Sequence, residues 1–227
     1  MQIAHALLPM KNTDHLVHTL KKYLPEGAVH QCVEWLVHHR VHLRITKERT
    51  SKLGDYQSPW GGKGHRISVN HNLNPYAFLI TFVHEMAHLV AFDKYKRNIA
   101  PHGKEWKYEY RELMRPFFHQ QLFPADIQEA LMKYLHNPAA ATCSDHHLLR
   151  ALKKYDAPHR QQLTVEQLPN GAVFILRTRQ PLILKKGPLQ RTRYQCTELR
   201  TNRIYLVNAL AEAELPDPAQ LNVFVNR

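Results

Sequence analysis

The sequence His-Glu-Met-Ala-His, at positions 84 to 88, constrains this 227-residue chain more than any other stretch. Residues four apart on an α-helix lie on the same face, so the imidazoles of His84 and His88 can bind one metal ion. Glu85 lies one step further round the helix and points at the open coordination position. The motif therefore predicts a zinc site in which Glu85 is the catalytic carboxylate and the two histidines are ligands.

The residues around the motif predict a long buried helix. Asn74 is a suitable N-cap, and Pro75 is tolerated at the first helical position. The helical pattern continues to about Asp93, with a broad apolar face that includes Phe78, Phe82, Met86 and Val90. A chance match to the motif would seldom fall inside such a helix.

A catalytic zinc usually takes three protein ligands and leaves the fourth position for water, so the chain must supply another donor. The metzincin pattern requires glycine three residues and histidine six residues after the second histidine, where this chain has Ala91 and Lys94. His102 is the next candidate, at the start of a predicted helix that extends to about Arg115. A glutamate donor, as in gluzincins, is the alternative, and the candidates are Glu105, Glu109 and Glu112.

Two segments together resemble the SprT family of zinc metallopeptidases, which includes eukaryotic proteases of DNA-protein crosslinks. They are Val-His-Glu-Met-Ala-His-Leu at 83 to 89 and Pro-His-Gly-Lys-Glu-Trp-Lys at 101 to 107. The resemblance covers about residues 10 to 135 and implies that His102 is the third ligand. It also implies one catalytic Zn²⁺, a zincin-like fold, and hydrolysis of peptide bonds in DNA-associated or DNA-crosslinked proteins.

The alternative from another class is a DNA-binding protein with a structural, non-catalytic zinc site. Such a site would close with a fourth protein ligand and would not need a carboxylate between its histidines. Glu85 and the lack of paired cysteines favour the peptidase.

The charge of the chain indicates a polyanionic partner. Its 31 Lys and Arg residues exceed its 19 Asp and Glu residues and give a net charge of +12. Such an excess favours nucleic acid, and DNA in particular fits the family resemblance.

Cysteine usage and hydropathy predict a cytoplasmic protein with no membrane partner. The three cysteines are widely spaced and odd in number, which does not suggest a disulfide framework and fits a reducing compartment. No uninterrupted apolar run reaches the roughly 18 residues of a membrane span, and residues 1 to 10 lack a charged leader.

The first 138 residues predict an α+β domain: a zincin-like metalloprotease core of helices and a small antiparallel sheet. Amphipathic helices are expected at 11–24, 26–39 and 124–135, and short strands at 41–46, 52–57 and 65–70, with a glycine-rich turn at 61–64. Edge strands of zinc proteases bind the substrate backbone by β-addition, and residues 67–70 are the candidate here.

Residues 139–227 predict a second domain, a small basic β-rich module. Strands are expected at 162–168 and 172–177 on either side of Pro169-Asn170-Gly171, and then at 182–186, 190–199 and 203–207. Between Ala172 and Tyr205 there are eight basic residues and one acidic residue. In Arg191-Thr192-Arg193-Tyr194 the two arginines are expected to share one strand face beside an aromatic ring, a pattern that suits phosphate contact and base stacking. The predicted nucleic-acid contacts are Lys185, Lys186, Arg191, Arg193 and Tyr194.

SprT relatives often carry a C-terminal zinc ribbon of paired cysteines, and this chain departs from that pattern. Cys143 and Cys196 are single, with His146, His147 and His159 as possible companions for a second zinc. The module is expected to fold on its β core alone.

Overall fold

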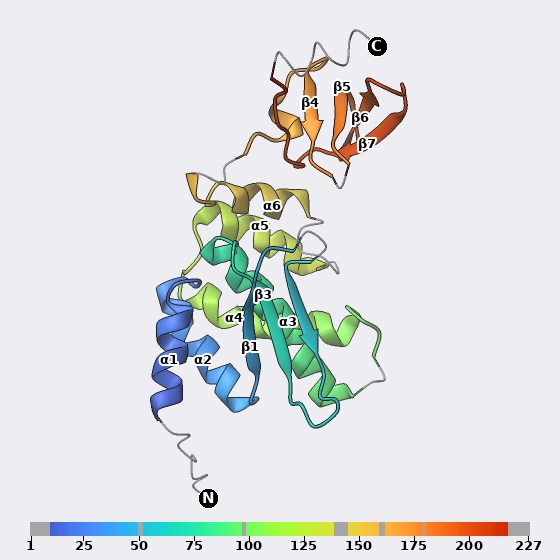
Figure 1. Cartoon of the computed structure of the whole chain (residues 1–227). Coiled ribbons are helices and arrows are strands. Elements are labelled where there is room, and N and C mark those ends of the chain that lie inside the picture. Colours follow the sequence, from blue (N-terminus) through green and yellow to red (C-terminus); the bar gives the residue numbers. More distant parts are fainter. Residues whose placement is uncertain are drawn as a thin grey trace, which may run out of the picture. The chain divides into compact units, whose positions relative to one another are not determined.

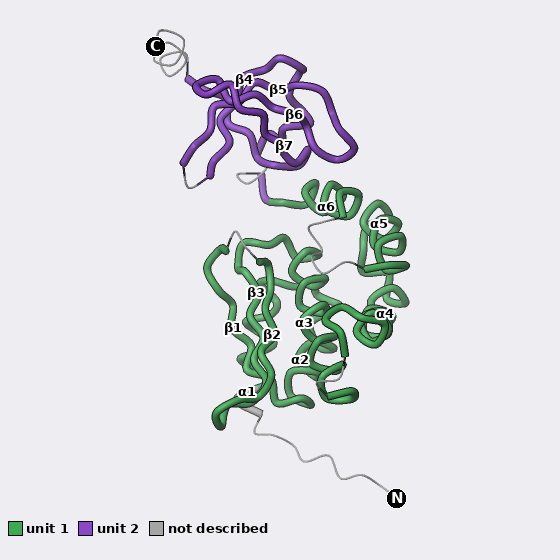
Figure 2. The backbone as a smooth tube through the Cα atoms, turned by 90° about the vertical axis from the view of Figure 1, so that its right-hand side faces the viewer, with its two compact units in different colours: residues 1–156 green, residues 157–227 purple. Residues whose placement is uncertain are grey.

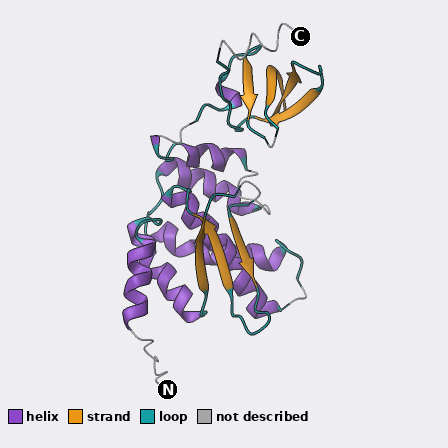
Figure 3. Cartoon of the chain, in the orientation of Figure 1, coloured by secondary structure: helices purple, strands orange, loops and turns teal. Residues whose placement is uncertain are grey.

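The structure is a computed structural model that describes residues 10–49, 52–96, 99–138, 145–158, 162–178 and 180–217. The chain divides into two compact units, Met1–Asp156 and Ala157–Arg227 (Figure 2). Each unit has its own cluster of buried apolar side chains. The protein is therefore an α+β protein with helices and two small sheets (Figure 3).

The first unit packs helices against one face of a three-stranded sheet (Figures 1 and 2). Its helices are α1 (Met10–Leu20), α2 (Val29–His38), α3 (Pro75–Tyr95), α4 (Lys104–His119), α5 (Ala125–His136) and α6 (His146–Lys153). Its strands are β1 (His42–Thr46), β2 (Gly54–Gln57) and β3 (Arg66–Asn70), and a single 3₁₀ turn, Glu26–Ala28, precedes α2.

The sheet has the order β1-β3-β2, with β1 parallel to β3 and β2 antiparallel to β3. The expectation of a purely antiparallel sheet is therefore wrong, because β3 follows β2 through a hairpin and then inserts beside β1. The expectation that residues 67–70 form an edge is also wrong. β3 is the central strand and its backbone pairs on both sides, so it cannot add a substrate strand.

Helix α3 is the centre of the first unit. The side chains of Phe78, Phe82 and Met86 are fully buried, and the sheet contributes Ile67 and Val69 to the same core. By length and composition α3 is the one helix in the described segments that could cross a membrane, but 78% of the relevant window is buried inside this unit. A core helix of a globular unit passes the same test, so the finding is weak evidence for a membrane span.

The first unit ends after Asp156, whereas the sequence analysis put the boundary after Pro138. Helix α6 packs on α5 and contributes Leu148 and Leu152 to the main core. The side-chain amide of Asn74 donates hydrogen bonds to the Leu152 carbonyl (2.9 Å) and the Asp156 carboxylate (2.7 Å). These contacts join α6 to the start of α3, and no local pattern in the sequence reveals them.

The second unit contains a four-stranded antiparallel sheet of order β4-β5-β6-β7. The strands are β4 (Val173–Leu176), β5 (Leu182–Gln190), β6 (Arg193–Glu198) and β7 (Ile204–Asn208). The predicted strand at 162–168 is instead a 3₁₀ turn, Val165–Gln167, because Thr164 and Gln167 form a capping box there. The small core consists mainly of Val165, Phe174, Leu184, Cys196 and Val207.

Asn74 offers a test of the tie between α3 and α6. Its side chain also accepts from the Ala77 amide (2.9 Å) as the N-cap of α3. We expect Asn74→Ala to lower the free energy of unfolding by about 2–4 kcal/mol, since one cap and two amide hydrogen bonds disappear. Asn74→Ser keeps a capping oxygen and should lower the free energy of unfolding by about half as much. Denaturant unfolding of wild type, Asn74→Ala and Asn74→Ser measures these free energies. Equal stabilities for Asn74→Ala and wild type would exclude a stabilising contact between Asn74 and α6.

Candidate metal centre

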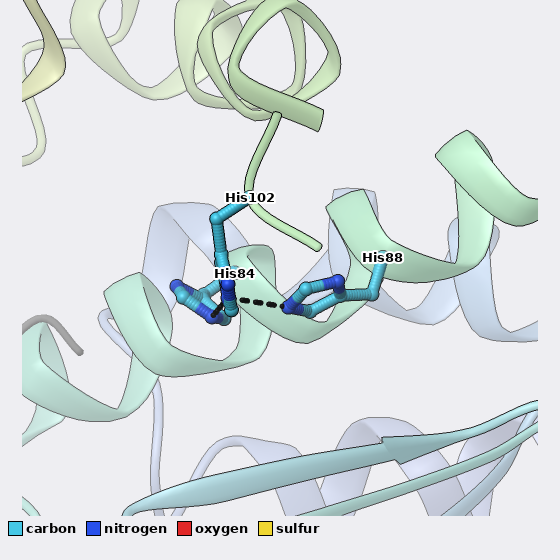
Figure 4. Close-up of side chains that lie close together, drawn as sticks. All are labelled: His84, His88 and His102. Atoms are coloured by element: carbon cyan, nitrogen blue, oxygen red, sulfur yellow. Dashed lines mark hydrogen bonds between the residues drawn. The ribbon is translucent and has the colours of Figure 1, made fainter. Parts of the chain in front are cut away.

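Three histidines converge in the first unit (Figure 4). His84 and His88 project from one face of α3, and His102 comes from the loop before α4, where its backbone has φ +58°. The Nε2 atom of His102 lies 2.9 Å from Nε2 of His88 and 3.2 Å from Nε2 of His84. One ligand atom from each of the three residues lies within 4.8 Å of the others, so this group could hold a metal ion.

The geometry of this group fits zinc. Tetrahedral bonds of about 2.0–2.1 Å place ligand nitrogens roughly 3.3 Å apart, close to both short separations here. Metal ligation also needs unprotonated imidazoles. Desolvation, helped by the neighbouring histidines, lowers the pKa of His84 to about 3 and that of His88 to about 4. Burial and then Lys107 also lower the pKa of His102, so all three rings favour the neutral form.

Trp106 on α4 holds the three imidazoles in place. Its indole is 1% exposed, and its ring centroid lies 4.7 Å from that of His84, 5.3 Å from His88 and 4.6 Å from His102. Because the Trp106 ring is fully packed, the histidine rotamers have little room to change. Trp106 is the tryptophan of the segment at 101 to 107, and packing against the histidines is its role in the fold.

Glu85 lies against the edge strand β2. Its side chain is buried, and its carboxylate accepts a hydrogen bond from the backbone amide of Tyr56. Desolvation and the nearby carboxylate of Asp55 raise the pKa of Glu85 to about 8, against the opposing effects of Lys52 and Arg49. Gly54 allows this close approach, since a Cβ atom there would lie 2.5 Å from Glu85 Oε1.

The three glutamates considered as alternative ligands have other partners. Glu109 is buried and bonds to the Lys94 ammonium (2.8 Å) and the Tyr95 hydroxyl (3.1 Å). Glu105 lies 3.8 Å from Lys104, and Glu112 pairs with Arg115. Within the described segments, the group that could hold a metal contains His102 and none of these carboxylates.

A polar network beside the site was not anticipated from the sequence. The Tyr56 hydroxyl lies 3.0 Å from His65 Nδ1, and the carboxylate of Asp93 lies 3.4 Å from His65 Nε2 and 3.6 Å from His39 Nδ1. The Tyr56 ring is nearly parallel to the His88 ring, with centroids 6.5 Å apart. The alternation in β2 predicts that Tyr56 faces inward, but no sequence signal brings His39, His65 and Asp93 together.

The predicted nucleic-acid residues of the second unit have different environments. Lys186 is buried, and its ammonium donates to the Glu166 and Leu168 carbonyls and lies 3.9 Å from the centroid of the Tyr194 ring. Lys186 is therefore a structural residue and is not available to phosphate, and its ammonium covers one face of Tyr194.

The basic residues near the start of β6 do not share one strand face, in contrast to the expectation. Arg191 lies in the turn between β5 and β6 with φ +56°, whereas Arg193 is the first residue of β6. Lys185 and Arg193 are exposed.

The second zinc proposed from the sequence finds no support in the described segments. Cys196 is a buried free cysteine in the core of the second unit, and Cys143 and His159 lie outside the described residues. His146 and His147 begin α6 in the first unit.

The fold and the three converging imidazoles define an α+β protein with a candidate metal centre on a core helix. The model of the SprT-like family matches residues 13–128, slightly more than half of the chain. This chain belongs to the SprT-like family, which is associated with zinc metalloprotease activity. Comparison with curated proteins and with solved structures gave no match.

Gly54 provides a test of the contact between β2 and Glu85. A Cβ atom at this position would also lie 2.7 Å from Cγ2 of Thr81. We expect Gly54→Ala to lower the free energy of unfolding by about 1–3 kcal/mol, because the strand must move away from α3. Gly64→Ala is the matched control, since its Cβ would meet only the Arg40 carbonyl at 3.8 Å. Comparable losses in the two variants in thermal unfolding would contradict the close approach.

His102 can be distinguished from the glutamates by metal content. We expect His102→Ala purified with Zn²⁺ to retain far less metal than wild type, because it removes one of the three converging nitrogens. Glu105→Ala, three residues away, should retain the wild-type amount. Elemental analysis after dialysis gives both values, and a zinc-poor Glu105→Ala with a zinc-replete His102→Ala would assign the third ligand to the glutamate.

Proposed function

We propose that this protein is a zinc-dependent metallopeptidase that hydrolyses peptide bonds in proteins bound or crosslinked to DNA. The observation that carries the catalytic part is the convergence of three Nε2 atoms on the helix that also bears Glu85. A catalytic zinc site needs three protein ligands and an open fourth position, and the described residues supply three.

His84, His88 and His102 would hold the metal through their Nε2 atoms. When bound, Zn²⁺ would act as a Lewis acid that polarises the scissile carbonyl and lowers the pKa of the attacking water. His84 is buried, and the Trp106 indole packs against all three rings, so few side-chain rotations have to be frozen when the site assembles.

Glu85 acts as the general base and then as the general acid. The carboxylate takes a proton from the attacking water and later delivers it to the leaving amine. Its burial raises the pKa above that of an ordinary glutamate, the direction that makes the carboxylate a stronger proton acceptor. The Tyr56 amide fixes one carboxylate oxygen and leaves the group aligned with the metal ligands on α3.

Strand β2 is the part of the sheet best suited to bind the substrate backbone. It is an edge strand, and Gly54 and Tyr56 on it contact Glu85. An extended peptide that pairs with β2 would run beside the catalytic carboxylate. This role replaces the one assigned from the sequence to residues 67–70.

The choice of DNA-associated proteins as substrates depends on charge and on the family resemblance. The net charge of +12 favours a polyanion near the enzyme.

The proposed location is the cytoplasm. The two cysteines described as free, Cys32 and Cys196, are buried thiols compatible with a reducing environment, and we assign the protein to the cytoplasm on that basis.

The alternative is a DNA-binding protein with a structural zinc. It requires a fourth protein ligand, and the group found in the described segments has three members. It also leaves the buried carboxylate of Glu85 without a role. We therefore favour the peptidase.

Glu85→Gln tests the enzymatic assignment. The change removes the base but no metal ligand, so zinc content and unfolding temperature should stay near wild type while peptide cleavage falls by about 10²–10⁴-fold. Cleavage of a denatured protein substrate, followed by gel and mass spectrometry, measures the loss. A metal-loaded Glu85→Gln protein that cleaves at the wild-type rate would exclude Glu85 as the catalytic base.

A further inference from the structure

The face of the first sheet that points away from α3 carries a group of cations. Ile67 and Val69 on β3 are buried against the helices, so residues that alternate with them lie on the opposite face. In Figure 2 helices α2, α3 and α4 lie on the other side of this sheet. Strand pairing places His42 opposite Arg66 and Arg44 opposite Ser68 on that outer face.

Two arginines on this face have contacts that define their positions. Arg49 crosses the outer face and donates to Asn70 Oδ1 (2.8 Å) and Ser68 Oγ (3.0 Å). The Nε atom of Arg66 is buried and has no hydrogen-bond partner within the part of the chain that the structure describes. We call Arg44, Arg49 and Arg66, together with the neighbouring His42, the cationic sheet face.

Negative charge on this face is largely neutralised. Asp55 pairs with Ser68 in the sheet register, and its carboxylate bonds to the Lys52 ammonium (2.7 Å) and the Gln57 amide (3.0 Å). From Arg40 to Arg66 the chain has two acidic residues, Glu48 and Asp55, against seven Lys or Arg residues. The segment that forms the sheet therefore has a net charge of +5 (seven minus two).

The hairpin between β2 and β3 ends in an exposed tryptophan. The backbones of Trp60 and Lys63 pair in both directions at 3.1 Å, and Gly61 and Gly62 between them have φ +58° and +75°. Positive φ at both central residues makes this a tight two-residue turn that glycine favours. The Trp60 side chain is 78% exposed, and the cationic Lys63 is its cross-strand neighbour. The exposed indole offers a flat face on which an unpaired base can stack.

We propose that the cationic sheet face and the Trp60 tip form a binding site for single-stranded nucleic acid. Arg44 and Arg66 would contact phosphates, and an unpaired base would stack on the Trp60 indole beside Lys63. A duplex offers no free base face along its length, so the aromatic tip selects single strands. A lipid surface fits less well, because the rest of this face is polar, with Ser68 and Gln57 beside the cations.

The proposal extends the proposed function. Tyr56, at the base of the same hairpin, bonds through its amide to Glu85 and through its hydroxyl to His65. The hairpin therefore links the proposed nucleic-acid site to the strand that contacts the candidate catalytic carboxylate. Binding itself needs neither metal nor cleavage, so its failure and the failure of the peptidase assignment can be told apart.

Trp60 provides a direct optical signal. Of the three tryptophans, Trp106 is buried and Trp35 is partly buried against the core, so quenching by a bound base reports Trp60. We expect an oligo(dT) strand to quench the emission of the full-length, metal-free protein. Trp60→Leu keeps apolar area but removes the flat ring, and should abolish the quench and weaken binding about 5- to 150-fold. Trp60→Phe should bind with an intermediate affinity.

Salt titrations test the cations. Each phosphate contact to a single strand contributes about 0.7 to the slope of log affinity against log salt. The pair Arg44→Gln and Arg66→Gln should therefore reduce the slope by about 1.4 units. Lys21→Gln with Lys22→Gln removes the same charge from exposed positions in the first unit and should leave the slope unchanged. Lys185→Gln with Arg193→Gln makes the equivalent change in the second unit.

Three results would overturn the proposal. An unchanged slope in the Arg44 and Arg66 variant would show that this face does not contact phosphate. Loss of binding in the Lys185 and Arg193 variant alone would assign the nucleic acid to the second unit. A Trp60 emission change with anionic phosphatidylserine vesicles, and none with oligo(dT), would assign the hairpin to membranes. Circular dichroism and unfolding temperature must match wild type for each variant.

Discussion

Burial of helix α3 is the constraint on which both the fold and the candidate site depend. The same desolvation that makes α3 the core helix keeps His84 and His88 neutral and raises the pKa of the Glu85 carboxyl. Apolar residues at positions 84, 85 and 88 would be buried without loss of polar hydration. The side chains of His84, Glu85 and His88 therefore make the folded protein less stable than it could be. The proposed metal ion and the proposed proton-transfer role of Glu85 would account for keeping them there.

The local part of this arrangement could be predicted from the sequence. Asn74 and Pro75 mark the start of α3, and the four-residue spacing of His84 and His88 fixes their common face. The family resemblance, and not spacing, pointed to His102, and its convergence with the other two depends on the loop before α4. The strand positions were also close to those found, because alternation and turn residues are local signals.

The pairing of elements distant in sequence could not be predicted. Nothing in the pattern of residues 65–70 says that β3 inserts between β1 and β2, and so the edge of the sheet was assigned to the wrong strand. Lys185 and Lys186 are adjacent and chemically identical, yet Lys185 is exposed, whereas Lys186 is buried and its ammonium donates to two backbone carbonyls. Counting charge along the chain therefore located the basic segments but not the accessible cations.

The contact between Asn74 and α6 has a consequence for how such a protein can diversify. Because α6 closes the first core just before Ala157, the residues that complete the histidine-bearing helix are all on one side of that point. The second unit has a separate core of its own. Gene fusion or exchange at this junction would therefore replace the second unit without removing any residue of the core that holds the histidine-bearing helix.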